Sequence, residues 1–193
     1  MKRNKKSLED ETELFHHRLK NTIPNSIKRF QWVRNNERIV DLDHKSLWPN
    51  VKRLYDEGRY CYCLGLFYAS IFSIGSCIEA YYDQIIRYRF RDLIPELHTG
   101  DKGHFNVYNA IKKVRSRNAI SEEVTERVIK FRTNIRNLAT HQMAMMEPPL
   151  GYKEIKIGEY ESDTLEDPLT PEDSAKEGLL CILQLFKEFD TWK

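Results

Sequence analysis

The stretch SEEVTERVIKFRTNIRNLATHQMAMM, residues 121–146, has the strongest helical pattern of the chain. Its apolar residues recur at spacings of four and three, as in an amphipathic helix packed on a core: Val124, Val128, Phe131, Ile135, Leu138 and Met145. Ser121 suits the N-cap, and two glutamates follow it near the positive end of the helix dipole. Pro148 and Pro149 end the pattern. We therefore expect this helix to form one wall of a helical core.

The same helix carries a polar group, Arg136, Asn137 and His141. At about 100° per residue, Asn137 and His141 share a face, so the amide of Asn137 can orient the imidazole. Arg136 lies about 140° from His141 around the axis of a straight helix. A joint site for Arg136 and His141 therefore requires a local distortion of the helix or two copies that meet around a two-fold axis.

Further helices are predicted towards the N-terminus. Residues 7–21 suit an accessory helix, and residues 27–43 suit either a short helix or a loop. Residues 44–58 suit a short helix that ends at Gly58. Residues 59–90 are the longest candidate and should form the central helix.

Three residues of the expected central helix are notable. Gly65 and Gly75 lower helix propensity, so we expect them to let a neighbouring helix approach closely. Glu79 is the first acid after an uncharged run, residues 60–78. It is either an ordinary surface carboxylate or a partner of Arg136 or His141, since buried acids are generally paired.

The C-terminal half follows the same plan. A polar turn at residues 98–103 precedes a helix at 105–117, which contains the basic run KKVRSR. Residues 148–171 form an acidic connection with a possible small strand or hairpin. A capping Thr170 and Pro171 start the last helix. The expected fold is an all-α bundle of four or five helices, residues 59–193, with residues 1–58 as an N-terminal helical extension packed on it.

Length and composition limit the class of protein. The 193 residues suit one domain with peripheral additions, and the net charge of +2 gives no sign of a nucleic-acid binder. The four cysteines lack the spacing of a zinc or redox site, so we expect reduced core residues and no cofactor. The charged first twenty residues contain no signal peptide, which favours the cytoplasm. Glycine, serine and tyrosine within residues 60–78 favour a buried helix over a membrane span.

The order of these helices and the motif Arg136-Asn137-x-x-x-His141 resemble the HEPN superfamily over roughly residues 59–192. The resemblance implies a metal-independent endoribonuclease, often a toxin or phage-defence effector, that commonly forms a homodimer. It also implies RNA as a partner and, in some members, a cognate antitoxin. One subgroup has a tyrosine two residues after the histidine, where this chain has Met143, so modification of that tyrosine by a nucleotidyltransferase antitoxin is not expected.

The residue types suit RNA cleavage by a neighbouring 2′-hydroxyl. His141 can move protons at neutral pH, and Arg136 can stabilise the charge that develops on the phosphate. Asn137 would fix the imidazole or contact RNA, and Glu79 would hold Arg136 in place. Six further cations are candidate RNA-phosphate contacts, although basic runs are usually solvated faces: Lys112, Lys113, Arg115, Arg117, Lys130 and Arg132. The alternatives are a non-catalytic HEPN-type module that binds RNA, a nucleotide or a protein, and a purely structural bundle.

Overall fold

A computed structural model describes residues 23–42, 47–99, 104–136 and 170–190. These residues are helical except for turns, short connections and one antiparallel pair of two-residue strands, so the predicted all-α class is confirmed. The first described helix covers residues 23–39. The remaining elements are α2 (Pro49–Cys63), α3 (Phe67–Arg89), η1 (Arg91–Leu93), α4 (Ile94–Leu97), β1 (His98–Thr99), β2 (His104–Phe105), α5 (Val107–Ser116), α6 (Glu122–Lys130), η2 (Phe131–Arg136) and α8 (Pro171–Asp190).

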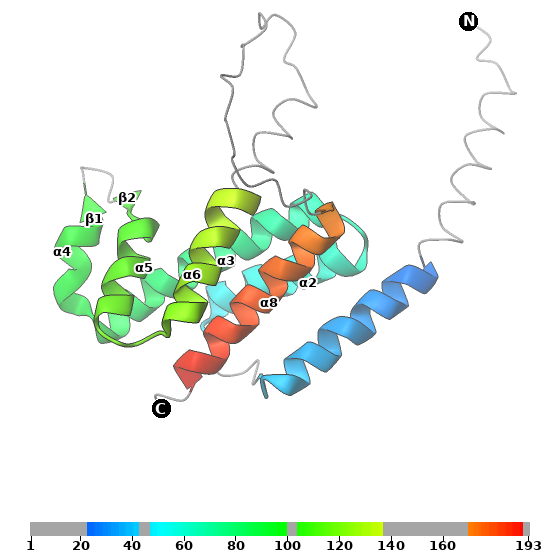
Figure 1. Ribbon diagram of the computed structural model, residues 1–193, viewed down its shortest axis with the longest axis horizontal. Helices are drawn as coiled ribbons and strands as arrows, with labels where there is room; N and C mark the ends of the chain where they lie inside the picture. The colour runs from blue at the N-terminus through cyan, green and yellow to red at the C-terminus, as the bar shows by residue number, and fades with distance from the viewer. Residues whose placement is uncertain (1–22, 43–46, 100–103, 137–169, 191–193) are drawn as a thin grey trace, which may run out of the picture.

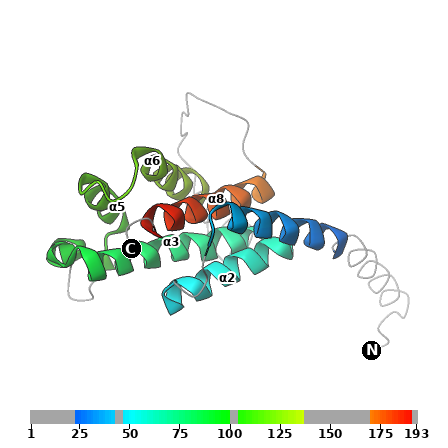
Figure 2. The same cartoon turned by 90° about the horizontal axis from the view of Figure 1, so that it is seen from below.

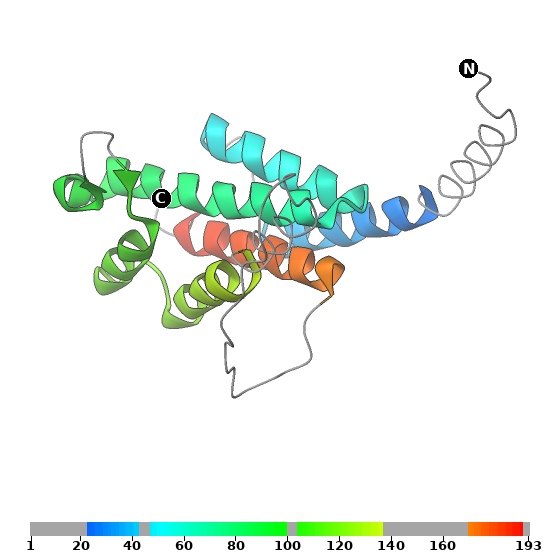
Figure 3. The ribbon, with the colours of Figure 1, turned by 90° about the horizontal axis from the view of Figure 1, so that it is seen from above.

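Helix α3 lies at the centre of the bundle and packs against α2, α5, α8 and η2 (Figure 1). Helices α2 and α6 lie on opposite sides of α3 (Figures 2 and 3). Along α3 the core residues recur at helical spacing and are almost fully buried, including Ile74, Ile78, Tyr82, Ile85 and Ile86. The wide apolar surface of α3 therefore holds helices on several sides, as predicted for a central helix.

The helix boundaries near the two glycines differ from the prediction. Gly58 does not end a helix but lies buried inside α2, where an added Cβ would be 2.5 Å from Cδ1 of Ile74. The chain turns instead at Gly65, whose φ of +80° favours glycine. The predicted boundary between residues 58 and 59 thus falls within one continuous helix. The predicted roles of both glycines are therefore wrong: Gly58 allows close packing with Ile74, and Gly65 forms the turn.

Both predicted helix caps are present. The Ser121 hydroxyl accepts a hydrogen bond from the Val124 amide at 3.2 Å, and the Thr170 hydroxyl accepts one from the Asp173 amide at 3.1 Å. The segment 27–43, left open between helix and loop, is helical as far as residue 39. The helix expected at 7–21, the strand or hairpin expected within 148–171 and the helix expected at 137–146 lie outside the described residues.

All four cysteines are free, and Cys63, Cys77 and Cys181 are buried in the core as predicted. Cys61 is only partly buried, so its predicted place in the core is wrong. Burial raises the pKa of the Cys181 thiol to about 12, so this group is a poor nucleophile at neutral pH. Among the described helices, none combines the length and the apolar character that crossing a membrane requires.

Candidate functional site

The candidate site begins where α6 changes its helical type. After Lys130 the chain continues as the π-helix η2, residues Phe131–Arg136. Two side-chain contacts lie in this segment. The Thr133 hydroxyl donates a hydrogen bond to the Ile129 carbonyl at 2.9 Å. Such a bond competes with the backbone amide for the same carbonyl oxygen. The buried ring of Phe131 lies so close to α8 that a Cβ on Gly178 would be 2.6 Å from its Cε2 atom. Short π-helical segments are frequent at functional sites.

Arg136 ends η2 and faces α3. Its Nη1 lies 3.4 Å from Oε1 of Glu79, and its side-chain stem passes over Gly75. A Cβ at Gly75 would be 3.1 Å from Cγ of Arg136, so this glycine provides the space in which the arginine lies. Gly75 thus has the predicted role of allowing a neighbouring helical segment to approach.

The same carboxylate oxygen binds a second arginine. Nη2 of Arg132 lies 2.9 Å from Oε1 of Glu79, closer than the guanidinium of Arg136. Arg132 and Arg136 are four residues apart and therefore share one side of η2. The three side chains carry a net charge of +1 and are 19% to 29% exposed, so solvent reaches the cluster. We name Glu79, Arg132 and Arg136 the Glu79 cluster.

Asn137 and His141, the other two motif residues, lie outside the described residues. A straight α-helix directs Arg136 and His141 about 140° apart, and a local distortion was one of the two conditions for a joint site. The distorted segment η2 ends at Arg136, so the angle between Arg136 and His141 depends on residues outside the described part of the chain.

The basic run at residues 112–117 lies apart from the Glu79 cluster. Nζ of Lys113 lies 2.9 Å from Glu96, and Arg115 lies 3.2 Å from Glu122. Arg117 pairs with Asp92, and Lys112 lies over the ring of Tyr108 at 4.2 Å. Arg115 contacts the first residue of α6, whereas Arg136 lies about 20 Å further along α6 and η2 at 1.5 Å per residue. Of the six candidate phosphate contacts, Arg132 joins Arg136, and exposed Lys130 lies at the end of α6.

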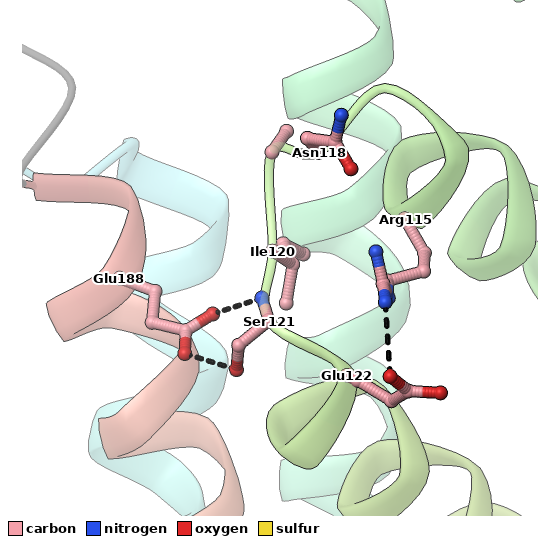
Figure 4. A pocket seen from close by; sticks show the side chains of 7 residues that line it. Arg115, Asn118, Ile120, Ser121, Glu122 and Glu188 are labelled. Atoms are coloured by element: carbon pink, nitrogen blue, oxygen red, sulfur yellow. Dashed lines mark hydrogen bonds and ion pairs between the residues drawn. The ribbon is translucent and has the colours of Figure 1, made fainter.

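A shallow hollow of about 410 Å³ marks the other end of α6 (Figure 4). The Ser121 amide donates to one oxygen of Glu188 at 2.8 Å, and the Ser121 hydroxyl donates to the other. A carboxylate of α8 therefore already occupies the amino end of α6, where an anion would otherwise bind. This hollow joins two helices and is not the candidate site. Within the described part of the chain, no group of three His, Cys, Asp or Glu residues is arranged to hold a metal ion.

The sequence indicated Glu79 as one possible partner of Arg136, but not that Arg132 shares its carboxylate. The spacing of four between the two arginines was the available signal. No protein-family model, curated protein or solved structure matches this chain. Its function is therefore inferred from the Glu79 cluster and from the motif that begins at Arg136.

Proposed function

We propose that this protein is a metal-independent endoribonuclease of HEPN type, which acts as a toxin or phage-defence effector. One observation carries the proposal: η2 holds Arg136 against Glu79 over Gly75, at the residue where the Arg-Asn-x-x-x-His motif begins. The all-α bundle, in which Arg136 lies against the long central helix, agrees with the HEPN resemblance. RNA is the proposed substrate.

The proposed reaction uses the 2′-hydroxyl of the substrate as nucleophile. Its oxygen bonds to phosphorus while the bond from phosphorus to the 5′-oxygen of the next nucleotide breaks. The products are a 2′,3′-cyclic phosphate and a 5′-hydroxyl. His141 moves the protons between the attacking and leaving oxygens, and Asn137 orients its imidazole. Arg136 donates hydrogen bonds to the phosphate oxygens, whose charge grows in the transition state.

The Glu79 cluster suits Arg136 to this task. Arg132 is the closer partner of Glu79, and Arg136 is the more distant one. When Arg136 turns to an incoming phosphate, Arg132 still neutralises Glu79, so the carboxylate does not repel the substrate. Glu79 and Arg132 are in this scheme positioning residues, which act through Arg136 without touching the reacting atoms.

A homodimer completes the proposed cleft. Two copies of the η2 end, related by a two-fold axis, bring Arg136 of one copy towards His141 of the other. Light scattering at micromolar concentration should then give a mass twice 23.0 kDa. A monomer at 23.0 kDa that still cleaves RNA would contradict the shared cleft. A cognate antitoxin would act by covering the same cleft.

Cleavage of labelled single-stranded RNA tests the activity. We expect products that form in EDTA, carry cyclic phosphate ends and disappear when the substrate has a 2′-deoxy sugar at the cleaved position. His141→Ala and Arg136→Ala should each lower the rate by about 100-fold or more. Arg127→Ala is the matched control, because Arg127 lies on α6 and pairs with Glu177 of α8 at 2.6 Å, away from the motif. Equal losses in all three variants would contradict the proposal.

The second candidate is a non-catalytic HEPN-type module that binds RNA, a nucleotide or a protein at the same cluster. The shared carboxylate favours it, since both guanidinium groups already have an anionic partner. Such a module would bind RNA without cutting it, and its affinity would fall in Arg136→Ala but not in His141→Ala.

A further inference from the structure

Apart from the Glu79 cluster, an exposed group of aromatic and basic side chains lies at the C-terminal end of α3. The sequence there is Arg87-Tyr88-Arg89-Phe90-Arg91. The side chain of Tyr88 is 60% exposed, and its ring stacks on Trp48 with centroids 5.5 Å apart and planes inclined by 19°. Trp48 also contacts buried Tyr81, at 5.5 Å. Tyr88 is thus the solvent end of an aromatic stack that starts in the core.

Arginines precede and follow Tyr88 in the sequence, at positions 87, 89 and 91. Arg87 pairs with Asp83 at 2.8 Å, and Nε of Arg91 donates to the Arg87 carbonyl at 2.9 Å. The guanidinium of Arg89 lies 5.8 Å from the ring centre of Phe189. These interactions fix the side chains while leaving all three arginines exposed. Arg87 and Arg89 suit the negative end of the helix dipole, but that role explains neither Arg91 nor the exposed face of Tyr88.

We propose that Tyr88 and its flanking arginines bind single-stranded RNA. One base stacks on the exposed face of Tyr88, while Arg89 and Arg91 contact phosphates on either side of it. This combination of an aromatic platform and cations is how proteins bind single strands without reading their sequence. The proposal rests on the proposed function in that it names single-stranded RNA as the substrate class.

The platform is separate from the Glu79 cluster. Tyr88 follows Glu79 by nine positions, about 180° around α3. Trp48 precedes α2, which lies on the opposite side of α3 from α6 (Figures 2 and 3). The platform therefore holds a part of the RNA away from the scissile phosphate. Three arginines within five residues favour an anionic partner, and the exposed stacked ring favours a partner that carries bases; RNA combines both.

Fluorescence anisotropy with a labelled 2′-O-methyl single-stranded oligonucleotide tests binding without cleavage, because this probe has no 2′-hydroxyl nucleophile. Tyr88→Ala should weaken binding by about tenfold, the effect of losing one stacked base. Tyr88→Phe keeps the ring and should bind like the wild type. Tyr60→Ala is the matched control, since Tyr60 is 55% exposed and has Arg59 over its ring at 5.0 Å, but lies near the other end of α2. Thermal unfolding by circular dichroism checks that each variant is folded.

The salt dependence separates the two parts of the platform. Arg89→Gln and Arg91→Gln should each reduce the slope of log affinity against log salt concentration by about 0.7, whereas Tyr88→Ala should leave it unchanged. Three results would overturn the proposal that Tyr88 binds RNA. They are unchanged affinity in Tyr88→Ala, an equal loss of affinity in Tyr60→Ala, and no binding of the probe by the wild type. RNA cleavage with any of these results would leave the proposed function intact. Tyr88-dependent binding without any cleavage would support the platform and contradict the nuclease.

Discussion

Two glutamates in this protein bind two arginines each, in very different surroundings. Glu37, on the helix of residues 23–39, is 3% exposed, whereas Glu79, on α3, is 29% exposed. Glu37 accepts hydrogen bonds from Arg34 at 2.8 Å, from Arg59 at 3.1 Å and from the Tyr55 hydroxyl at 3.0 Å. We name these four residues the Glu37 cluster. Glu79 receives its two arginines from a single segment, η2, and one of the two contacts is 3.4 Å long.

The difference separates a structural ion pair from a site that can exchange partners. The Glu37 cluster joins two helices, and its donors come from three side chains that cannot turn away without leaving a buried charge. At the Glu79 cluster water can replace a lost contact at little cost, so under the proposed function Arg136 can leave the carboxylate for a phosphate. The same pair of residue types is therefore buried within the fold in one place and within reach of solvent in the other.

Removing the buried carboxylate should have the largest effect. Glu37→Ala leaves Tyr55 and the mostly buried Arg59 without their shared acceptor, and should lower the free energy of unfolding by about 3 kcal/mol. Urea denaturation followed by circular dichroism measures the change. A loss below about 1 kcal/mol would mean that Asp56, which binds Arg59 at 2.8 Å, suffices to hold it, and that the Glu37 cluster is no stronger than a surface pair.

The Glu37 cluster should also make the fold sensitive to alkali. Burial, followed by the charge of Glu37, raises the pKa of Tyr55 well above its usual value of about 10. The unfolded phenol therefore loses its proton first, so stability from this group is complete below pH 10 and falls as the pH rises above it. The slope is about 1.4 kcal/mol per pH unit for one such group. Tyr55→Phe should therefore reduce the slope of the free energy of unfolding against pH between pH 10 and 11. An unchanged slope would mean that Tyr55 is not the source of the sensitivity to alkali.

Glu79→Gln should change stability by less than about 1 kcal/mol, because its pairs are partly exposed. Under the proposed function it should lower the rate of RNA cleavage by about 10- to 100-fold, since Arg136 loses the group that positions it. Glu177→Gln is the matched control: Glu177 is similarly exposed and binds Arg127 of α6. The free energy of unfolding and the rate of RNA cleavage should be measured for both variants. Equal cleavage rates in the two would mean that Glu79 does not position Arg136.

Local signals predicted much of this fold. The caps at Ser121 and Thr170 and the apolar stripe of α6 depend on neighbouring residues alone, and the structure confirms them. The turn between α2 and α3 was misplaced because Gly58 and Gly65 are equal as local signals. The packing of Ile74 against Gly58, between different helices, decides between them.

Apart from the close approach at Gly75, features that depend on contacts between distant segments were not predicted. The π-helical segment η2 lies where Phe131 packs against Gly178 of α8, far along the chain. The sequence of residues 27–43 did not distinguish a helix from a loop, because polar residues interrupt its apolar stripe. Glu37 is one of these residues, and its burial depends on donors from α2. At the candidate site, the Glu79 partner was one of two alternatives, while the convergence of Arg132 and Arg136 required the orientation of η2.

Gly75→Ala should have the smallest effect on stability and still disturb the Glu79 cluster. Alanine favours a helix over glycine by about 1 kcal/mol, which offsets the cost of moving Arg136 away from a Cβ at 3.1 Å from its Cγ. The free energy of unfolding should therefore change by no more than about 0.5 kcal/mol. The displaced Arg136 should lower RNA cleavage by about tenfold.

Gly178→Ala is the contrasting variant, because its Cβ would be 2.6 Å from the buried ring of Phe131 and should destabilise the fold by about 1 to 2 kcal/mol. If Gly75→Ala retained full activity with unchanged stability, the place of Arg136 over Gly75 would be a matter of packing alone, and the Glu79 cluster would belong with the Glu37 cluster as a structural feature.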